Sequence, residues 1–254
     1  ALGQLPGGTY TQPAALSADG STVVGKASSS TASQTAFRWT AATGLVDLGD
    51  LPGGVVDSYA TAVNADGSVV VGHGTSAGKP LPSGGSTALT NEGFRWTAAG
   101  GLVGLGALSG SPYGSDARAV SADGNVIVGT ATPADGFPRA LRWTSGTGLV
   151  DLGLPTGDGQ AEANGVSADG SIVTGTSYNN TTGSRAVFRW TAADGLTSLG
   201  TIAGGTSGNA TGISADGSVI IGYDRVSSSI RRAFRWTAAE GFILLGDFAG
   251  GQDF

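Results

Sequence analysis

The strongest constraint on the fold is one sequence pattern that occurs five times along the chain. Each copy contains an Asp-Gly pair, a short apolar run that is followed by glycine, and an Arg-Trp-Thr triplet. The tryptophans of the triplets are Trp39, Trp96, Trp143, Trp190 and Trp236, and they lie 57, 47, 47 and 46 residues apart. Repetition at this period is typical of architectures in which each unit buries its apolar surface against its neighbours. We therefore expect a single repeat domain over residues 1–254.

Each copy is predicted to form four short β-strands. The Asp-Gly pair favours a hairpin turn between the first two strands, because glycine tolerates a positive φ. The first strands are predicted to end at Leu16, Val63, Val120, Val166 and Ile213, and each second strand at the glycine after its apolar run. In the third strand, Phe37-Arg38-Trp39-Thr40 and its equivalents place Phe and Trp on one face and Arg on the other. The Leu-rich segment after each triplet is the fourth strand, and no segment has helical periodicity.

Four antiparallel strands in each repeat are typical of a β-propeller blade. The sequence thus predicts an all-β fold, a closed ring of about five blades, with a parallel β-helix or solenoid as the alternative. The repeats span approximately residues 9–54, 55–110, 111–157, 158–204 and 205–254, and residues 1–8 match only part of a copy. Residues 2–5 are interpreted either as an outer strand of another blade or as a closing strand that competes with residues 242–248. The longer second repeat is expected to contain an irregular loop at residues 79–85.

Composition limits the classes of function. The chain has no cysteine, which excludes disulfides, zinc-cysteine sites and thiol nucleophiles. Its net charge of −6 disfavours a nucleic-acid partner or an anionic membrane surface. The apolar runs are far shorter than the roughly 20 residues that a membrane-spanning helix requires, so no membrane insertion is expected. No motif for a cofactor or a metal is present, and the isolated turn aspartates are expected to stabilise turns rather than to bind calcium, which needs several oxygens at one site.

The blocks Thr35-Ala36-Phe37-Arg38-Trp39-Thr40 and Gly44-Leu45-Val46-Asp47-Leu48-Gly49 alternate with segments of the type Ser-Ala-Asp-Gly-Ser-Val-Val-Val-Gly. This pattern resembles the bacterial extracellular HAF repeats, which occur in secreted proteins and in the passenger regions of autotransporters. The resemblance covers essentially the whole chain, with departures such as Leu141 in place of Phe. It implies an extracellular or cell-surface location in bacteria, and it implies no catalytic residue.

Three sets of repeated or single residues have expected structural roles. The Phe and Trp of each third strand should be buried between blades, because they are the largest apolar side chains of each copy. The strand arginines are expected to bond acceptors in their own or the next blade, because a guanidinium between blades needs such acceptors. They are Arg38, Arg95, Arg142, Arg189 and Arg235. The single histidine, His73, is interpreted as a surface side chain, since Lys26, Thr130, Thr176 and Tyr223 replace it in the other copies.

Candidate binding residues come from the positions that vary between copies. The loops between the second and third strands differ in every copy, and variable loops on a rigid scaffold are where binding specificity is usually placed. If the first strand is innermost, its variable positions surround the mouth of the central channel. These positions give the candidate site residues Gln12, Tyr59, Asp116, Arg118, Glu162, Asn164 and Asn209. We expect Asp116 and Glu162 to converge with Arg118 between them, either as a charge-balanced plug of the channel or as a polar ligand pocket.

The sequence favours a non-catalytic binding or adhesion module that recognises a glycan or a surface protein. A passive spacer in an autotransporter passenger is the first alternative. The second is a carbohydrate-active propeller enzyme with Asp116 and Glu162 as paired carboxylates at the channel mouth. Scattered polar residues, rather than dense acids with aromatic platforms, favour binding over catalysis.

Overall fold

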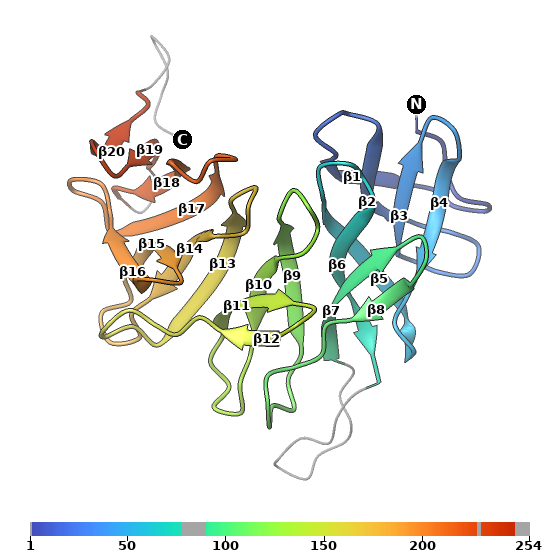
Figure 1. Cartoon of the computed structure of the whole chain (residues 1–254), viewed down its shortest axis with the longest axis horizontal. Coiled ribbons are helices and arrows are strands. Elements are labelled where there is room, and N and C mark those ends of the chain that lie inside the picture. Colours follow the sequence, from blue (N-terminus) through green and yellow to red (C-terminus); the bar gives the residue numbers. More distant parts are fainter. Residues whose placement is uncertain (1, 78–89, 228–229, 247–254) are drawn as a thin grey trace.

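The computed structural model describes residues 2–77, 90–227 and 230–246, and this part of the chain is all-β. Its twenty strands form antiparallel sheets in which four strands follow one another in sequence order (Figure 1). Each such sheet is one blade. The described residues contain no helix long and apolar enough to cross a membrane.

The strands have the following bounds. Blade 1 contains β1 (Thr11–Leu16), β2 (Thr22–Ala27), β3 (Thr35–Thr40) and β4 (Gly44–Gly49). Blade 2 contains β5 (Gly53–Val63), β6 (Val69–Ser76), β7 (Thr90–Thr97) and β8 (Gly101–Gly104). Blade 3 contains β9 (Ser115–Val120), β10 (Ile127–Ala131), β11 (Arg139–Thr144) and β12 (Gly148–Asp151). Blade 4 contains β13 (Gln160–Val166), β14 (Ile172–Tyr178), β15 (Arg185–Thr191) and β16 (Gly195–Gly200). Blade 5 contains β17 (Ser207–Ile213), β18 (Val219–Arg225), β19 (Arg231–Thr237) and β20 (Gly241–Leu244).

The four predicted strands per repeat are therefore confirmed, and every first strand ends at the predicted residue. A single parallel pair, Arg185 with Ser207, joins the sheets of blades 4 and 5. The loop expected at residues 79–85 lies outside the described residues.

The blades form an open arc (Figure 1). The first strands β1, β5, β9, β13 and β17 pack on one another in succession, so they line the inside of the arc. Among the described elements, extensive packing joins only blades that are consecutive in sequence. The prediction of a closed ring is therefore wrong for the described part of the chain. Residues 2–5 form no strand, so neither interpretation of this segment holds; Leu2 and Leu5 instead pack on Phe37 of blade 1.

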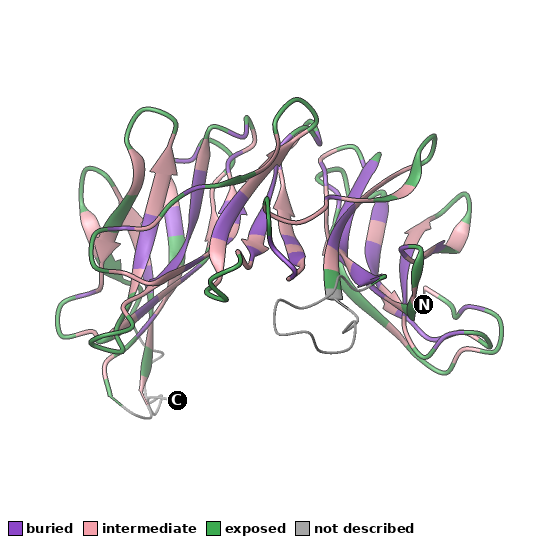
Figure 2. Ribbon diagram, turned by 90° about the horizontal axis from the view of Figure 1, so that it is seen from below, coloured by how far each residue is buried: buried purple, intermediate pink, exposed green. Residues whose placement is uncertain are grey.

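The core lies between the blades, and buried residues concentrate in the strands (Figure 2). We call the side of a blade that faces the next blade its forward face, and the opposite side its backward face. Between blades 1 and 2, Val24 and Leu48 of the forward face pack on Val70, Phe94 and other residues of the backward face. The same arrangement recurs at the other three interfaces.

The prediction that the third-strand aromatic residues are buried holds fully for one of the two positions. The Phe or Leu position is 0% exposed in every blade, as shown by Phe37, Phe94, Leu141, Phe188 and Phe234. The five tryptophans are only partly buried. Four pack at the edges of the clusters between blades, and Trp39 packs at the edge of the cluster that Leu5 forms with Phe37 of blade 1.

Each second strand runs through the glycine that was expected to end it. The glycine has another role, because the first strand of each blade has a β-bulge beside it, where one residue lacks a partner. In blade 3 the bulged residue is Arg118, and a Cβ on Gly129 would lie 1.9 Å from the carbonyl oxygen of Asp116. The equivalent distances in the other blades are 1.9 to 2.1 Å. The repeated glycine therefore permits a close approach of two strands and does not terminate one.

The Asp-Gly turns join neighbouring blades at one end of the arc. Their glycines have φ between 71° and 74°, as the sequence predicted. The alanine before each Asp donates its backbone N–H to the equivalent alanine carbonyl of the next blade. This ladder runs from Ala18 to Ala65, Ala122, Ala168 and Ala215 with distances of 3.1, 3.2, 2.9 and 2.8 Å.

The arginine prediction is confirmed, and in the first three blades the acceptor is a glycine carbonyl in the turn of the next blade. The donor and acceptor pairs are Arg38 and Gly67 at 3.0 Å, Arg95 and Gly124 at 3.5 Å, and Arg142 and Gly170 at 3.4 Å. Arg189 pairs with Asp194 at 3.9 Å, and Arg235 bonds Glu240 at 2.6 Å, both within their own blades. These bonds and the alanine ladder hold the constant-turn end of the arc together.

Candidate functional site

The variable residues of the first two strands face one another across the hairpin of each blade. In blade 3, for example, Asp116 of β9 pairs directly with Thr130 of β10. The five pairs are Gln12 with Lys26, Tyr59 with His73, Asp116 with Thr130, Glu162 with Thr176, and Asn209 with Tyr223. The inner strands therefore carry two adjacent rows of variable side chains, on the loop side of the bulge.

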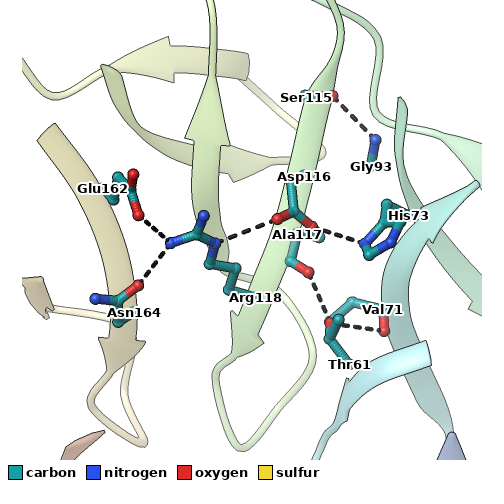
Figure 3. A network of polar contacts seen from close by, with 10 residues as sticks. All are labelled: Thr61, Val71, His73, Gly93, Ser115, Asp116, Ala117, Arg118, Glu162 and Asn164. Carbon is teal, nitrogen blue, oxygen red and sulfur yellow. Dashed lines mark hydrogen bonds and ion pairs between the residues drawn. The ribbon is translucent and has the colours of Figure 1, made fainter. Parts of the chain in front are cut away.

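Arg118 links two carboxylates from adjacent blades, as the sequence predicted (Figure 3). Its Nε lies 3.2 Å from Oδ2 of Asp116 in the same strand, and its Nη1 lies 2.7 Å from Oε2 of Glu162 in blade 4. Nη1 also donates to Oδ1 of Asn164 at 2.8 Å. The side chains of Arg118, Asp116 and Glu162 are 31%, 32% and 39% exposed, so the network is accessible to solvent from one side.

The bulged residues extend across the blade boundaries. Thr61 Oγ1 donates to the carbonyl of Ala117 at 2.7 Å, and Asn164 Nδ2 donates to the carbonyl of Ala210 at 3.0 Å. Arg118 is the bulged residue between them and bonds Glu162 of the next blade. A bulge changes the direction of its side chain. The three bulged residues therefore each bond to the next blade, and these contacts connect the inner strands of blades 2 to 5.

The charges of the network set its protonation. Burial by itself would raise the pKa of Asp116, but the hydrogen bond and charge of His73, together with those of Arg118, outweigh it and lower that pKa. Burial likewise disfavours the charged form of Arg118, and its contacts with Glu162 and Asp116 outweigh this and raise its pKa. Asp116 is therefore a carboxylate at neutral pH, and the Arg118 guanidinium separates it from Glu162.

His73 was interpreted as a surface side chain; its side chain is 26% exposed, but it also contacts the candidate site. Its Nδ1 lies 3.0 Å from Oδ1 of Asp116, and its ring makes an edge-to-face contact with Tyr59 at a centroid distance of 5.7 Å. Sequence variation at this position suggested a residue without a role. Strand pairing could have indicated its role. His73 lies opposite Tyr59 on the neighbouring strand, so it extends the row of candidate residues on the first strands.

Two pockets open beside the network. One, of about 480 Å³, is lined by Asp116, Arg118 and Glu162, by the connection between blades 2 and 3 at Tyr113, and by the β10–β11 loop at Pro138. The other, of about 410 Å³, is lined by residues of blades 4 and 5. Its polar residues include Glu162, Asn164, Thr176, Arg185, Asn209 and Tyr223. Glu162 borders both pockets, so a ligand that occupies either one is within reach of its carboxylate.

The remaining candidate residues are Asn209, Tyr59 and Gln12, and each lies in a different environment. Asn209 lies in the second pocket, where Arg185 Nη1 donates to its Oδ1 at 3.5 Å. Tyr59 packs on His73, with Lys26 Nζ 5.0 Å from its ring centroid. Gln12 is exposed on β1, and its side chain makes no polar contact with another described residue. The sequence did not identify Arg185, which reaches the second pocket from the start of β15.

The described residues contain no group of three or more His, Cys, Asp or Glu side chains that could hold a metal ion. Paired carboxylates in a glycosidase require one acid with a raised pKa. Asp116 shows the opposite shift, and the same guanidinium binds both Asp116 and Glu162. His73 and the Arg118 guanidinium thus keep Asp116 ionised, as an acceptor of hydrogen bonds.

Comparisons with known proteins show the fold. No family model matches the sequence, and no curated protein matches it. TolB from Acinetobacter baumannii is a similar solved structure, with a TM-score of 0.57, 15% identity, and coverage of 91% of this chain and 52% of that one. A prolyl endopeptidase has a TM-score of 0.61 with 14% identity, and covers 95% of this chain and 37% of that chain.

An oligogalacturonate lyase solved with manganese has a TM-score of 0.56 with 14% identity, and coverage of 92% and 62%. The chain thus spans less than two thirds of the length of each of these proteins. At such low identity the likeness shows the fold alone, and it shows that this all-β chain is built like a β-propeller.

Proposed function

We propose that the chain is an extracellular, non-catalytic binding module whose polar ligand occupies the pockets beside Asp116, Arg118 and Glu162. The observation that carries this proposal is the pairing of two variable rows along the inner strands, which border pockets of about 480 and 410 Å³. The opposite, constant end is held by repeated turns and a backbone ladder. A rigid scaffold with variation confined to one end is typical of binding proteins.

The pocket chemistry favours a ligand with many hydroxyl groups, such as an oligosaccharide. Carboxylate, guanidinium, amide and hydroxyl groups all border the two pockets, so they supply donors and acceptors together. The net charge of −6 disfavours a strongly anionic ligand. The resemblance to HAF repeats supports an extracellular location, where such ligands are found.

The test is an array of oligosaccharides probed with the purified chain, followed by calorimetric titration of the best ligand. Asp116→Asn and Glu162→Gln each remove a charge that faces the pockets. A lost hydrogen bond to a charged group is worth about 1.5 to 3 kcal/mol, so affinity should fall by roughly 10- to 100-fold. Asp194→Asn is the matched control, because Asp194 is an exposed carboxylate of the constant turn between β15 and β16.

Two outcomes contradict the proposal. If no oligosaccharide binds, the spacer alternative is favoured. If a ligand binds with unchanged affinity to both variants while their stability falls, the network is a structural plug and the ligand lies elsewhere.

A further inference from the structure

The forward face of blade 5 is uncovered at positions that are buried in blades 1 to 3. Ile221 is 48% exposed, whereas Val24, Val71, Val128 and Thr174 at the same repeat position are all 0% exposed. Leu245 is 59% exposed, and Leu48, Leu105 and Leu152 at its position are only 8 to 9% exposed. Ala233 is also exposed, whereas Ala36, Ala140 and Val187 are fully buried. Three positions that form the interface core in blades 1 to 3 thus face solvent in blade 5.

The backbone ladder also stops at this face. Each turn alanine from Ala18 to Ala168 donates its N–H to the turn carbonyl of the next blade. The N–H of Ala215 has no backbone acceptor among the described residues. A backbone donor at the edge of an apolar surface needs an acceptor if that surface becomes buried. The internal interfaces supply this acceptor through the turn of the following blade.

Exposure of apolar side chains elsewhere differs from this patch. Val46, Val103, Val150 and Ile243 on the outer strands are 39 to 56% exposed, and they occupy one repeat position. Their exposure is thus a property of the outer rim and not of an unpaired end. Single exposed apolar residues of this kind are ordinary at a protein surface.

We propose that the forward face of blade 5 is a docking site for one further four-stranded blade of this same repeat. The four internal interfaces show what such a face binds. Each receives a branched residue from the end of a first strand and an alanine carbonyl from an Asp-Gly turn, and three of them also receive a Phe from a third strand. Ile221, Ala233, Leu245 and the Ala215 N–H are the parts of this interface that blade 5 already provides.

A whole second copy fits this face less well. Its first blade has a backward face partly covered by its own Leu5, which is 5% exposed and packs with Phe37. Docking of a second copy would displace this segment.

The experiment extends the chain by joining a duplicate of residues 160–205, which contain the fourth blade, after residue 254. Amide exchange followed by NMR reports whether the added blade docks. The Ala215 amide should exchange about tenfold or more slowly in the extended chain, because it gains a buried acceptor. The unfolding midpoint should rise by roughly 5 °C or more as the apolar face is covered.

Ile221→Asp in the extended chain should restore fast exchange at Ala215, because the charge prevents burial of the face. Val103→Asp is the matched control on the outer rim and should leave the protection in place. Ile221 is half exposed in the original chain, so the variant should fold without the extension.

Equal exchange at Ala215 in the original and extended chains would overturn the proposal. Concentration-dependent association of the original chain in sedimentation, abolished by Ile221→Asp, would also overturn it by identifying a second copy as the occupant. The proposal does not depend on the ligand-binding function proposed above.

Discussion

Replacement of Arg118 by methionine tests whether the inner-strand network stabilises the arc. The substitution keeps most of the side-chain volume and removes the contacts with Asp116, Glu162 and Asn164. Hydrogen bonds to charged groups are worth about 1.5 to 3 kcal/mol each when buried. Because about a third of each charged side chain is exposed, solvent screening reduces this, and we expect a total loss of about 2 kcal/mol.

The assay is thermal and urea unfolding at pH 7, where a loss of this size lowers the midpoint by roughly 4 to 8 °C. Arg225→Met is the matched control, since it removes the same charge from an exposed side chain. The control should change the midpoint little.

The pH dependence of the loss separates charge from packing. The pKa of Asp116 is lowered in the folded state, so its ionised form contributes stability above the unfolded pKa of about 3.9. This contribution disappears as the pH falls through the lower folded value. The difference between wild type and Arg118→Met should therefore shrink as the pH falls below about 4. Equal midpoints at pH 7, or a difference that is the same at pH 3 and pH 7, would refute the reasoning.

Two further predictions concern the repeat itself. Gly129→Ala should destabilise the chain by about 2 to 3 kcal/mol in urea unfolding, because the new Cβ would lie 1.9 Å from the Asp116 carbonyl oxygen. Gly146→Ala, which meets no atom within 4 Å, should be nearly neutral, and equal stability of the two variants would contradict the bulge argument. Ser167→Ala should lower the unfolding midpoint near neutral pH, since the buried Ser167 hydroxyl bonds the Asp169 carboxylate at 2.6 Å. That bond lowers the Asp169 pKa to about 2, so this stabilisation is present above about pH 4 and is lost as the pH falls towards 2; a penalty that is independent of pH would contradict this.

The sequence by itself determined the local structure. The Asp-Gly pairs, the alternation in Phe-Arg-Trp-Thr and the repeat period predict four strands per blade, and the structure has them with first-strand ends at the predicted residues. These features depend on turn geometry and on the two-residue period of a strand, which short segments of sequence encode directly. The arginine contacts followed for the same reason, because a guanidinium on the forward face needs an acceptor in its own or the neighbouring blade.

The candidate site was only partly determined in this way. Asp116, Arg118 and Glu162 occupy equivalent positions of adjacent repeats, so their convergence followed from the repeat itself. His73 and Arg185 did not follow, because their places in the site depend on cross-strand pairing and on the path of a variable loop.

Tertiary structure alone decided the bulges and the open arc. A bulge depends on how two strands approach, so Gly129 marked a close contact with Asp116, although glycine in a sequence more often indicates the end of a strand. Closure depends on the rotation between successive blades, which sums small packing differences over the whole chain. Five similar copies fix the structure of each interface, but only the three-dimensional packing sets whether Ile221 of the last blade meets the first blade, and here it faces solvent.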